Sequence, residues 1–308
     1  MPESPQHRIA ALRAQLDDAN YRYFVLAKPT ISDPQYDKLM RELIELEKAH
    51  PELLSADSPS QRVGGEAISE FATVVHAVPM MSIDNTYDEA EVRAFDERVK
   101  KGLGGEEPPN YVLEPKVDGV AATLRYEGGI LVQAATRGDG RRGDDITPHA
   151  RTIHAIPLRL PEHPKHAVPR VLEVRGEVFM PNETFQKLNK QRAEAGEEVY
   201  KNPRNLTTGA LKQLDPKITA SRKLRFVCHG LGQVEPLPTD SYWEWLKLLA
   251  DWKLPVGEHT VFARNVDEVI KQIESFGEVR GSLAYQTDGM VIKVDSFKQR
   301  DRLGATSK

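Results

Sequence analysis

Residues 111–136 read YVLEPKVDGVAATLRYEGGILVQAAT and contain the clearest strand signals of the chain. The runs Tyr111–Glu114, Ala121–Tyr126 and Ile130–Thr136 are short, rich in β-branched residues and partly alternating, which is typical of strands. Glu127-Gly128-Gly129 separates the last two runs and predicts a hairpin between them. Because a hairpin joins antiparallel neighbours, this stretch favours an antiparallel sheet over a Rossmann alternation of strands and helices.

Further strands and helices are predicted downstream of the hairpin. The predicted strands are Leu172–Met180, Leu224–Gly230 and Met290–Val294, and the predicted helices are Asn182–Ala195, Ser241–Trp252 and Val266–Phe276. This mixture predicts an α+β domain of mostly antiparallel sheets with flanking helices.

The first 68 residues have a different pattern, which is helical. Ile9, Leu12 and Leu16 recur at helical spacing. A second helix is predicted to begin with Ser32 or Asp33 as its N-cap and Pro34 in its first turn, and to end before Pro51. The turn-rich segment DSPSQRVGG (57–65) then makes a plausible hinge. We therefore predict a small helical subdomain at residues 1–68, followed by the α+β domain at 69–308.

The composition excludes several classes of protein. Hydrophobic residues make up 39% and charged residues 29% of the 308, which suits a soluble chain with a real core. No run approaches the ~20 apolar residues of a membrane span, and the N-terminus has no signal-peptide pattern, so we expect a cytoplasmic protein without a membrane partner. The single cysteine, Cys228, excludes an internal disulfide and a cysteine-rich zinc site.

The net charge of −4 does not indicate a nucleic-acid-binding protein. Net charge is a weak guide, however, because local basic patches bind nucleic acid. Two basic clusters stand out, RGDGRR (137–142) and KNPRNLTTGALK (201–212). Solvated loops are the alternative interpretation of both.

The sharpest local motif is EPKVDG (114–119), in which Lys116 stands at a strand end before an acid and a glycine. Lysine attacks an electrophile only as the free amine, which a nearby cation or the removal of water favours. Lys293, in the predicted strand Met290–Val294, is a candidate for that second cation. Taken alone, the motif is weak and favours a surface lysine in a hairpin.

Three further motifs supply what a nucleotidyl transfer needs: TRGDG (136–140), EVRGE (173–177) and DGMVIK (288–293). Arginine can pair with phosphate, and lysine can neutralise charge on it. The acids Asp118, Glu177 and Asp288 could assist in binding Mg²⁺. The alternatives are a turn around Arg137, a cross-strand ion pair in EVRGE and a buried strand end at Lys293.

This ordered series resembles the nucleotidyltransferase motifs of DNA ligases and capping enzymes. Other segments are similar to the NAD⁺-dependent bacterial DNA ligases: Tyr23 with DPQYD (33–37), DSPSQRVG (57–64), PMMSIDN (79–85) and NPRN (202–205). The resemblance covers nearly all of the chain. It implies a helical subdomain that binds nicotinamide mononucleotide (NMN), followed by a nucleotidyltransferase domain that takes AMP from NAD⁺ with the help of Mg²⁺.

The resemblance also implies a role for each matching residue. Lys116 would carry AMP as lysyl-AMP, with Asp118 and Lys293 assisting. The residues implied to surround the AMP half of NAD⁺ are Ser82, Ile83, Glu114, Arg137, Glu177, His229, Val291 and Lys293. Those implied to hold the NMN half are Tyr23, Phe24, Asp33, Tyr36 and Asp37. Arg204 and Lys212 are implied to meet nicked double-stranded DNA.

The sequence also departs from the family. Phe24 stands where His or Tyr is more frequent, and Lys212 replaces an arginine, so a forked phosphate contact becomes a point charge. The chain stops at residue 308, before the family's next motif, OB domain, four-cysteine zinc finger and later domains. We therefore expect a monomeric fragment that adenylates itself, binds no zinc and does not seal nicks efficiently.

Two rival functions remain. An ATP-dependent ligase or GTP-dependent capping enzyme would use the same lysine, but it has no nicotinamide for the segment from Tyr23 to Asp37 to hold. A non-catalytic NAD⁺-binding or DNA-binding module would not need Lys116, Asp118, Glu177 and Lys293 together. The mass of the intact protein after incubation with NAD⁺, ATP or GTP separates these readings.

Overall fold

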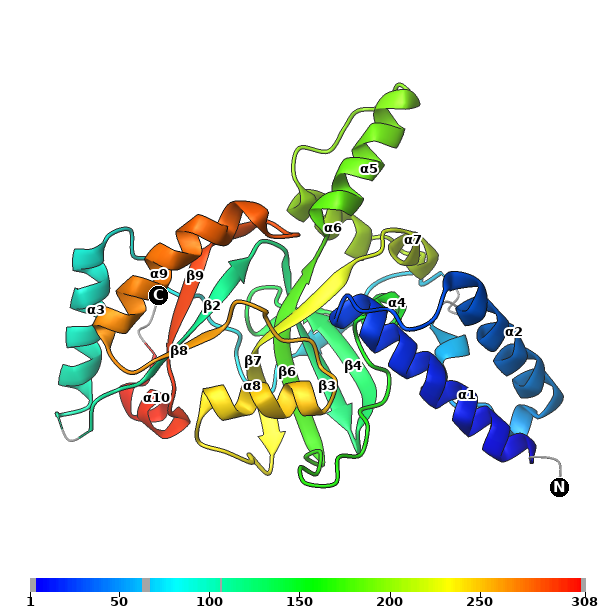
Figure 1. Ribbon diagram of the computed structural model, residues 1–308, viewed down its shortest axis with the longest axis horizontal. Helices are drawn as coiled ribbons and strands as arrows, with labels where there is room; N and C mark the ends of the chain where they lie inside the picture. Colours follow the sequence, from blue (N-terminus) through cyan, green and yellow to red (C-terminus); the bar gives the residue numbers. More distant parts are fainter. Residues whose placement is uncertain (1–3, 63–66, 106, 306–308) are drawn as a thin grey trace.

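The computed structural model describes residues 4–62, 67–105 and 107–305 and has three parts (Figure 1). A helical pair lies at one end, a four-stranded sheet lies in the middle, and a three-stranded sheet with its helices lies at the other end. The α+β class is confirmed. Residues 63–65 of the predicted hinge lie outside the described residues.

The four-stranded sheet has the order β4-β3-β6-β7, and all its neighbours are antiparallel. Its strands are β3 (Val120–Glu127), β4 (Ile130–Thr136), β6 (Val171–Phe179) and β7 (Arg225–Glu235). The predicted hairpin is confirmed, because Glu127 pairs with Ile130 across the β3–β4 turn.

The three-stranded sheet has the order β8-β2-β9 and is also antiparallel. It consists of β2 (Tyr111–Val117), β8 (Val261–Ala263) and β9 (Thr287–Val294). Two short strands, β1 (Thr73–Val75) and β5 (Arg142–Asp144), pair beside the larger sheet.

Helices cover the sheets and close two separate cores. The larger core lies between the four-stranded sheet and the helices around it, with Trp245 and Trp252 fully buried. The smaller one lies between the three-stranded sheet and α3 and α9. The helices of this part are α3 (Glu89–Gly102), α4 (Thr147–Thr152), α5 (Asn182–Glu194), α6 (Pro203–Leu211), α7 (Pro216–Ser221), α8 (Tyr242–Asp251), α9 (Val266–Val279) and α10 (Phe297–Leu303).

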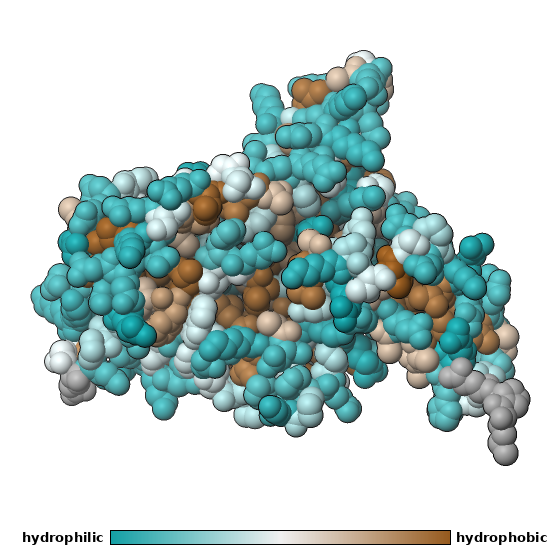
Figure 2. Space-filling view, in the orientation of Figure 1, coloured by the Kyte–Doolittle hydropathy of each residue, from teal (hydrophilic) through white to brown (hydrophobic). Residues whose placement is uncertain are grey.

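The surface that faces the viewer in Figure 2 is mainly hydrophilic, with hydrophobic residues gathered in its middle and over the helical pair. In the described part of the chain, none of the helices has the length and apolar character needed to cross a membrane.

The N-terminal helices form as predicted. They are α1 (Pro5–Asn20), which runs into a π-helical turn at Tyr21–Val25, and α2 (Asp33–Ala49). Ser32 is the N-cap of α2, and its backbone N–H donates to the Gln35 side chain at 2.8 Å, so Asp33 lies in the first turn rather than at the cap. Leu12, Leu16 and Leu43 are fully buried between the two helices, which gives the subdomain its own core.

The helical subdomain packs against the α4 side of the larger sheet. The Arg62 guanidinium is buried there and donates to the carbonyls of Arg151 at 3.2 Å and Ile156 at 3.0 Å. Lys253 pairs with Asp18 of α1 at 3.1 Å. A cavity of about 460 Å³ remains between the two parts.

Asp17 on α1 lines this cavity, and its burial predicts a pH-dependent instability. Burial raises the pKa of Asp17 from 3.8 to about 6, against the attraction of Arg62. The folded state therefore binds this proton more tightly than the unfolded state, so stability falls as pH rises through the window from about 4 to 6. We expect Asp17→Asn to gain at most about 3 kcal/mol of unfolding free energy at pH 7.5. The gain should vanish below pH ~4, as measured by urea unfolding.

Asp18 is the control with the opposite sign. Burial would raise its pKa, but hydrogen bonds from Arg22 and Lys253 lower it overall. This carboxylate stabilises the fold above its unfolded pKa and loses that effect as pH falls, so Asp18→Asn should destabilise the protein at pH 7.5. A gain for Asp17→Asn that is equal at pH 4 and pH 7.5 would contradict the assignment.

Some elements escaped prediction. The cluster 201–212 is mostly helix α6 rather than a solvated loop: Asn202 caps it by accepting from the Asn205 N–H at 2.8 Å, and Pro203 begins it. The solvated-loop alternative is therefore wrong for this segment. The cluster 137–142 does form a turn, with Gly138 at a φ of 56°.

Candidate active site

A cavity of about 880 Å³ opens between the two larger sheets. Its walls come from β2 and β9 on one side, from β3, β6 and β7 on the other, and from the segment around residues 78–85. Of the residues implied to act in the chemistry or bind the AMP half, the following line it: Ser82, Ile83, Glu114, Lys116, Arg137, Glu177, His229, Val291 and Lys293.

Strand β2 places two of these side chains on the cavity side. Tyr111 and Leu113 point into the core beneath α3 and α9. Successive side chains point to opposite faces of a strand, so Glu114 faces the cavity instead, opposite Val291 of β9. The register between β2 and β9 then shifts at residues 115–117, and Lys116 lines the cavity at this irregular end of the strand.

Strand β6 shows the same alternation. Leu172, Val174 and Val178 are buried in the larger core, while Glu173, Arg175 and Glu177 lie on the opposite face. Arg175 and Glu177 line the cavity. Glu173 is buried and accepts from the Thr123 hydroxyl at 2.8 Å, so it is a structural rather than a ligand-facing group.

Lys116 lies where β2 ends, and its ammonium pairs with Asp288 at 2.6 Å. Both side chains are partly exposed. Gly119 follows, and a Cβ there would lie 2.2 Å from the Val178 carbonyl oxygen. Only glycine therefore lets the β2–β3 turn approach β6 so closely. The sequence suggested Lys293 as a cation close to Lys116. In the structure the ammonium of Lys116 instead contacts the carboxylate of Asp288.

Lys293 is instead held in a buried network at the cavity floor. Its ammonium donates to Glu114 and to the His229 carbonyl, and the Tyr242 hydroxyl donates to Glu114 at 2.9 Å. Burial lowers the pKa of Lys293, and Glu114 acts in the opposite direction. The alternative of a buried strand end for Lys293 holds only in part, because the side chain is half-buried and lines the cavity.

This network predicts a large loss of stability when its carboxylate is neutralised. Glu114→Gln leaves the ammonium of Lys293 buried without a countercharge. We expect a loss of about 3 kcal/mol of unfolding free energy, as for a broken buried ion pair. Glu127→Gln is the matched control, because its pair with Arg125 at 2.8 Å is exposed and contributes less than about 1 kcal/mol. Urea unfolding measures both, and equal losses would contradict the role of burial.

The turn after β4 fixes the segment that carries Ser82 and Ile83. The Met80 N–H donates to the Gly140 carbonyl at 2.8 Å, and the Arg175 guanidinium donates to the Val78 carbonyl. Arg137 begins this turn and also lines the cavity. The two interpretations of Arg137, as part of a turn and as a residue that faces the ligand, are therefore compatible.

The three acids expected to assist Mg²⁺ do not converge. Asp118 pairs with Arg204 at 3.1 Å, Glu177 lies 3.4 Å from His229, and Asp288 pairs with Lys116. Among the described residues, none of these acids belongs to a group of three possible metal ligands. Arg204 lines the cavity near its rim, whereas Lys212 is exposed at the end of α6.

The residues implied to hold NMN lie outside this cavity, on the helical subdomain. Tyr23, Asp33 and Asp37 are exposed. Phe24 stacks on His154 at 4.8 Å between ring centroids, and Tyr36 packs against the α1–α2 core. The structure therefore does not bring this set together with Lys116.

Two residues at or near the cavity gave no sequence signal. Tyr242 was predicted only as part of the helix Ser241–Trp252, yet its buried hydroxyl contacts both Glu114 and Lys293. Arg300 on α10 lies over the Tyr242 ring at 4.6 Å. These contacts join residues far apart in the chain, so spacing could not have revealed them.

Comparison with known proteins agrees with this arrangement. Residues 68–308 match the family described as the NAD-dependent DNA ligase adenylation domain. Residues 2–64 match the DNA ligase-like, N-terminal NAD⁺-binding domain. A DNA ligase of Ectopseudomonas mendocina (strain ymp) is 47% identical over 96% of this chain and 38% of its own length. A DNA ligase of Desulforamulus reducens is 47% identical over 100% of this chain and 45% of its own length. A DNA ligase of Roseiflexus castenholzii is 46% identical over 99% of this chain and 44% of its own length.

The fold and the matched domains place this chain among the NAD-dependent DNA ligases. It is the NAD⁺-binding and adenylation module of such an enzyme, and it spans less than half the length of the curated relatives that it matches. The suspected resemblance is thereby confirmed at the level of the family.

Proposed function

We propose that Lys116 is the nucleophile that takes AMP from NAD⁺. The observation that carries the proposal is that the partly exposed Lys116 side chain lines the cavity of about 880 Å³, where its ammonium contacts Asp288. The neutral amine would attack the α-phosphorus of NAD⁺ in line. A phosphorus–nitrogen bond forms, the bond from that phosphorus to the bridging oxygen breaks, and NMN leaves with the electron pair.

The cavity residues would divide the remaining work with Asp118, which lies between Val117 and Gly119 of the cavity wall. Glu114, Ser82 and Ile83 would recognise adenine, with His229 beside the ring. Arg137 and Lys293 would offset negative charge on the phosphate. Asp118 and Glu177 would accept hydrogen bonds from ribose hydroxyls, and Val291 would contribute apolar surface. Before it attacks, the Lys116 amine must leave its contact with Asp288 and lose a proton.

Mg²⁺ fits this cavity only with the substrate's help. Mg²⁺ usually keeps several waters and binds through one or two carboxylates together with phosphates. The separated acids suit that mode, since Glu177 or Asp118 could each supply one ligand. When bound, the ion would neutralise charge on the phosphates.

The NMN half would be held by the helical subdomain through Tyr23, Phe24, Asp33, Tyr36 and Asp37. These residues lie outside the cavity, and we propose that the subdomain moves toward it during loading. In the whole protein, AMP would then pass to the 5′-phosphate of nicked DNA, in replication and repair, inside the cytoplasm. Arg204 and Lys212 would contact that DNA. A monomeric chain suffices for these steps.

The intact mass of the protein tests the proposal directly. Incubation with NAD⁺ and Mg²⁺ should add one AMP per chain, after any AMP carried from the host has been removed with NMN. ATP and GTP should add none at the same concentration. Loading from ATP as readily as from NAD⁺ would overturn the choice of donor.

A further inference from the structure

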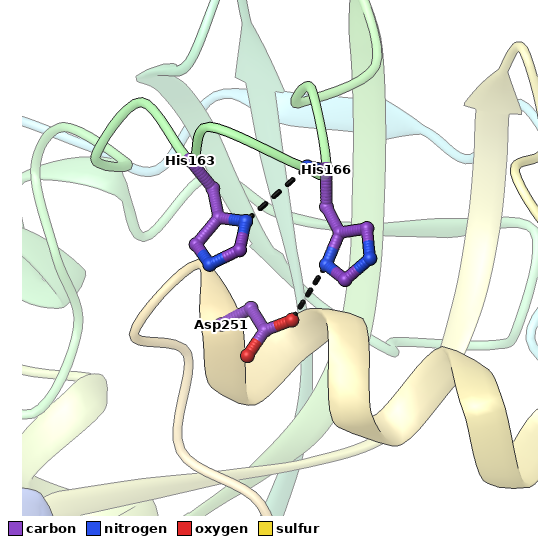
Figure 3. Close-up of side chains that lie close together, drawn as sticks. All are labelled: His163, His166 and Asp251. Carbon is purple, nitrogen blue, oxygen red and sulfur yellow. Dashed lines mark hydrogen bonds and ion pairs between the residues drawn. The ribbon is translucent and has the colours of Figure 1, made fainter.

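We propose that His163, His166 and Asp251 form a binding site for a divalent transition-metal ion, outside the adenylation cavity. One possible ligand atom from each residue lies within 4.8 Å of the other two. Figure 3 shows both imidazole rings and the carboxylate turned toward a shared space. All three side chains are partly exposed, and none of them lines either of the two cavities described above.

The backbone holds the two ligand-bearing segments together. His163 and His166 lie on the loop that leads into β6, and Asp251 is the last residue of α8. The buried Trp252, which follows α8, donates from its indole N–H to the His166 carbonyl at 2.9 Å. The His166 Nδ1 and Asp251 Oδ2 atoms lie 2.7 Å apart. The contact of Trp252 with the His166 carbonyl thus fixes the loop against the helix without using the side chains that would bind the metal.

The second histidine completes the set. Its ring stacks on that of His166, with centroids 5.0 Å apart and planes inclined by 13°. The His163 Nδ1 accepts from the backbone N–H groups of Lys165 and His166, at 3.4 and 3.2 Å. A metal bound at Nε2 needs the ring proton on Nδ1, and hydrogen bonds this long are given up at small cost. The ring of His163 would then offer its Nε2 lone pair to the shared space.

The ligand types select the class of ion. Two imidazoles and one carboxylate suit Zn²⁺, Cu²⁺, Ni²⁺ or Fe²⁺, whereas Mg²⁺ prefers oxygen ligands alone. Three protein ligands leave a position for water. The bound ion would join the loop to the end of α8, next to Lys253, which contacts Asp18 of the helical subdomain. It would therefore clamp the segment on which that subdomain rests.

Titration calorimetry of the full chain with ZnCl₂, after removal of metals with EDTA, tests the site. One Zn²⁺ should bind per chain, and Mg²⁺ in excess should not displace it. His163→Ala and His166→Ala should each weaken Zn²⁺ binding by at least about tenfold. Loss of a residue that only supports a metal ligand already costs about that much affinity. Zn²⁺ at about 100 times its dissociation constant should also raise the melting temperature by several degrees.

His50→Ala is the matched control, because His50 contacts the carboxylate of Glu52 at 3.3 Å but, among the described residues, belongs to no group of three possible metal ligands. Its Zn²⁺ affinity should equal that of the parent. Circular dichroism establishes that each variant is folded, and the visible bands of bound Co²⁺ report its ligand set independently of heat. Unchanged stoichiometry and affinity in the His163→Ala/His166→Ala double variant would overturn the proposal, as would a parent that binds no Zn²⁺.

Discussion

Lys116→Ala is expected to gain no AMP from NAD⁺, because the other lysine among the described residues that line the cavity, Lys293, is held by Glu114 and the His229 carbonyl. Lys116→Arg should fail as well, since a guanidinium stays protonated and is not nucleophilic at neutral pH. We expect loading to fall by at least about 10³-fold in both variants. Mass spectrometry of the intact chain and of the peptide that contains residue 116 makes the measurement.

The matched control is another lysine held by a carboxylate. Lys247 pairs with Glu244 at 2.7 Å on α8, about as closely as Lys116 pairs with Asp288, but it does not line the cavity. Lys247→Ala should therefore load AMP at the parent rate. A Lys116→Ala protein that still gains one AMP would remove Lys116 as the nucleophile, whatever the fate of the control.

The alternation of polar and apolar residues made much of the fold predictable. Leu172, Val174 and Val178 alternate with Glu173, Arg175 and Glu177, so the sequence itself indicates which face of β6 is buried. The capped start of α2 was equally clear. Helix α6 was not predicted, because its Thr and Gly residues weaken the helical pattern and the basic residues of the cluster 201–212 suggested a loop.

The partners within the site were not predictable from one sequence. The resemblance of the motifs to the family predicted that Glu114, Lys116 and Lys293 belong to one site. It did not predict which side chains they contact there. Lys116 meets Asp288 from 172 residues away, and Lys293 meets Glu114 from 179 residues away. Such pairings depend on the register between β2 and β9, which local patterns do not specify.

Substitution of the residues implied to hold NMN is expected to have a second large effect, on the rate of AMP transfer from NAD⁺. Asp33 and Asp37 are one helical turn apart on α2, so they lie on the same face, and Tyr23 is 44% exposed in the neighbouring turn. The cationic nicotinamide ring can stack on that tyrosine, and the two carboxylates can accept from ribose hydroxyls. Tyr36→Ala is a poor probe, because this ring packs in the α1–α2 core and its loss would also destabilise the fold.

Tyr23→Ala, Asp33→Asn and Asp37→Asn should each slow AMP transfer from NAD⁺ more than tenfold, a loss of more than ~1.4 kcal/mol of transition-state stabilisation. Tyr23→Ala combined with Asp37→Asn joins changes on two elements and should slow transfer more than about a hundredfold. NMN-driven release of AMP should slow as well, because it is the same step reversed. AMP already attached should stay as long as on the parent, since NMN contacts play no part in holding it.

Glu45→Gln is the control, because Glu45 is an exposed carboxylate farther along α2. It should load and release AMP at the parent rates. Rates of loading and of NMN-driven release, followed by intact mass over time, give both directions of the step. Parent-like rates in folded Tyr23→Ala, Asp33→Asn and Asp37→Asn proteins would rule out these three residues as the NMN site and leave the assignment of Lys116 intact.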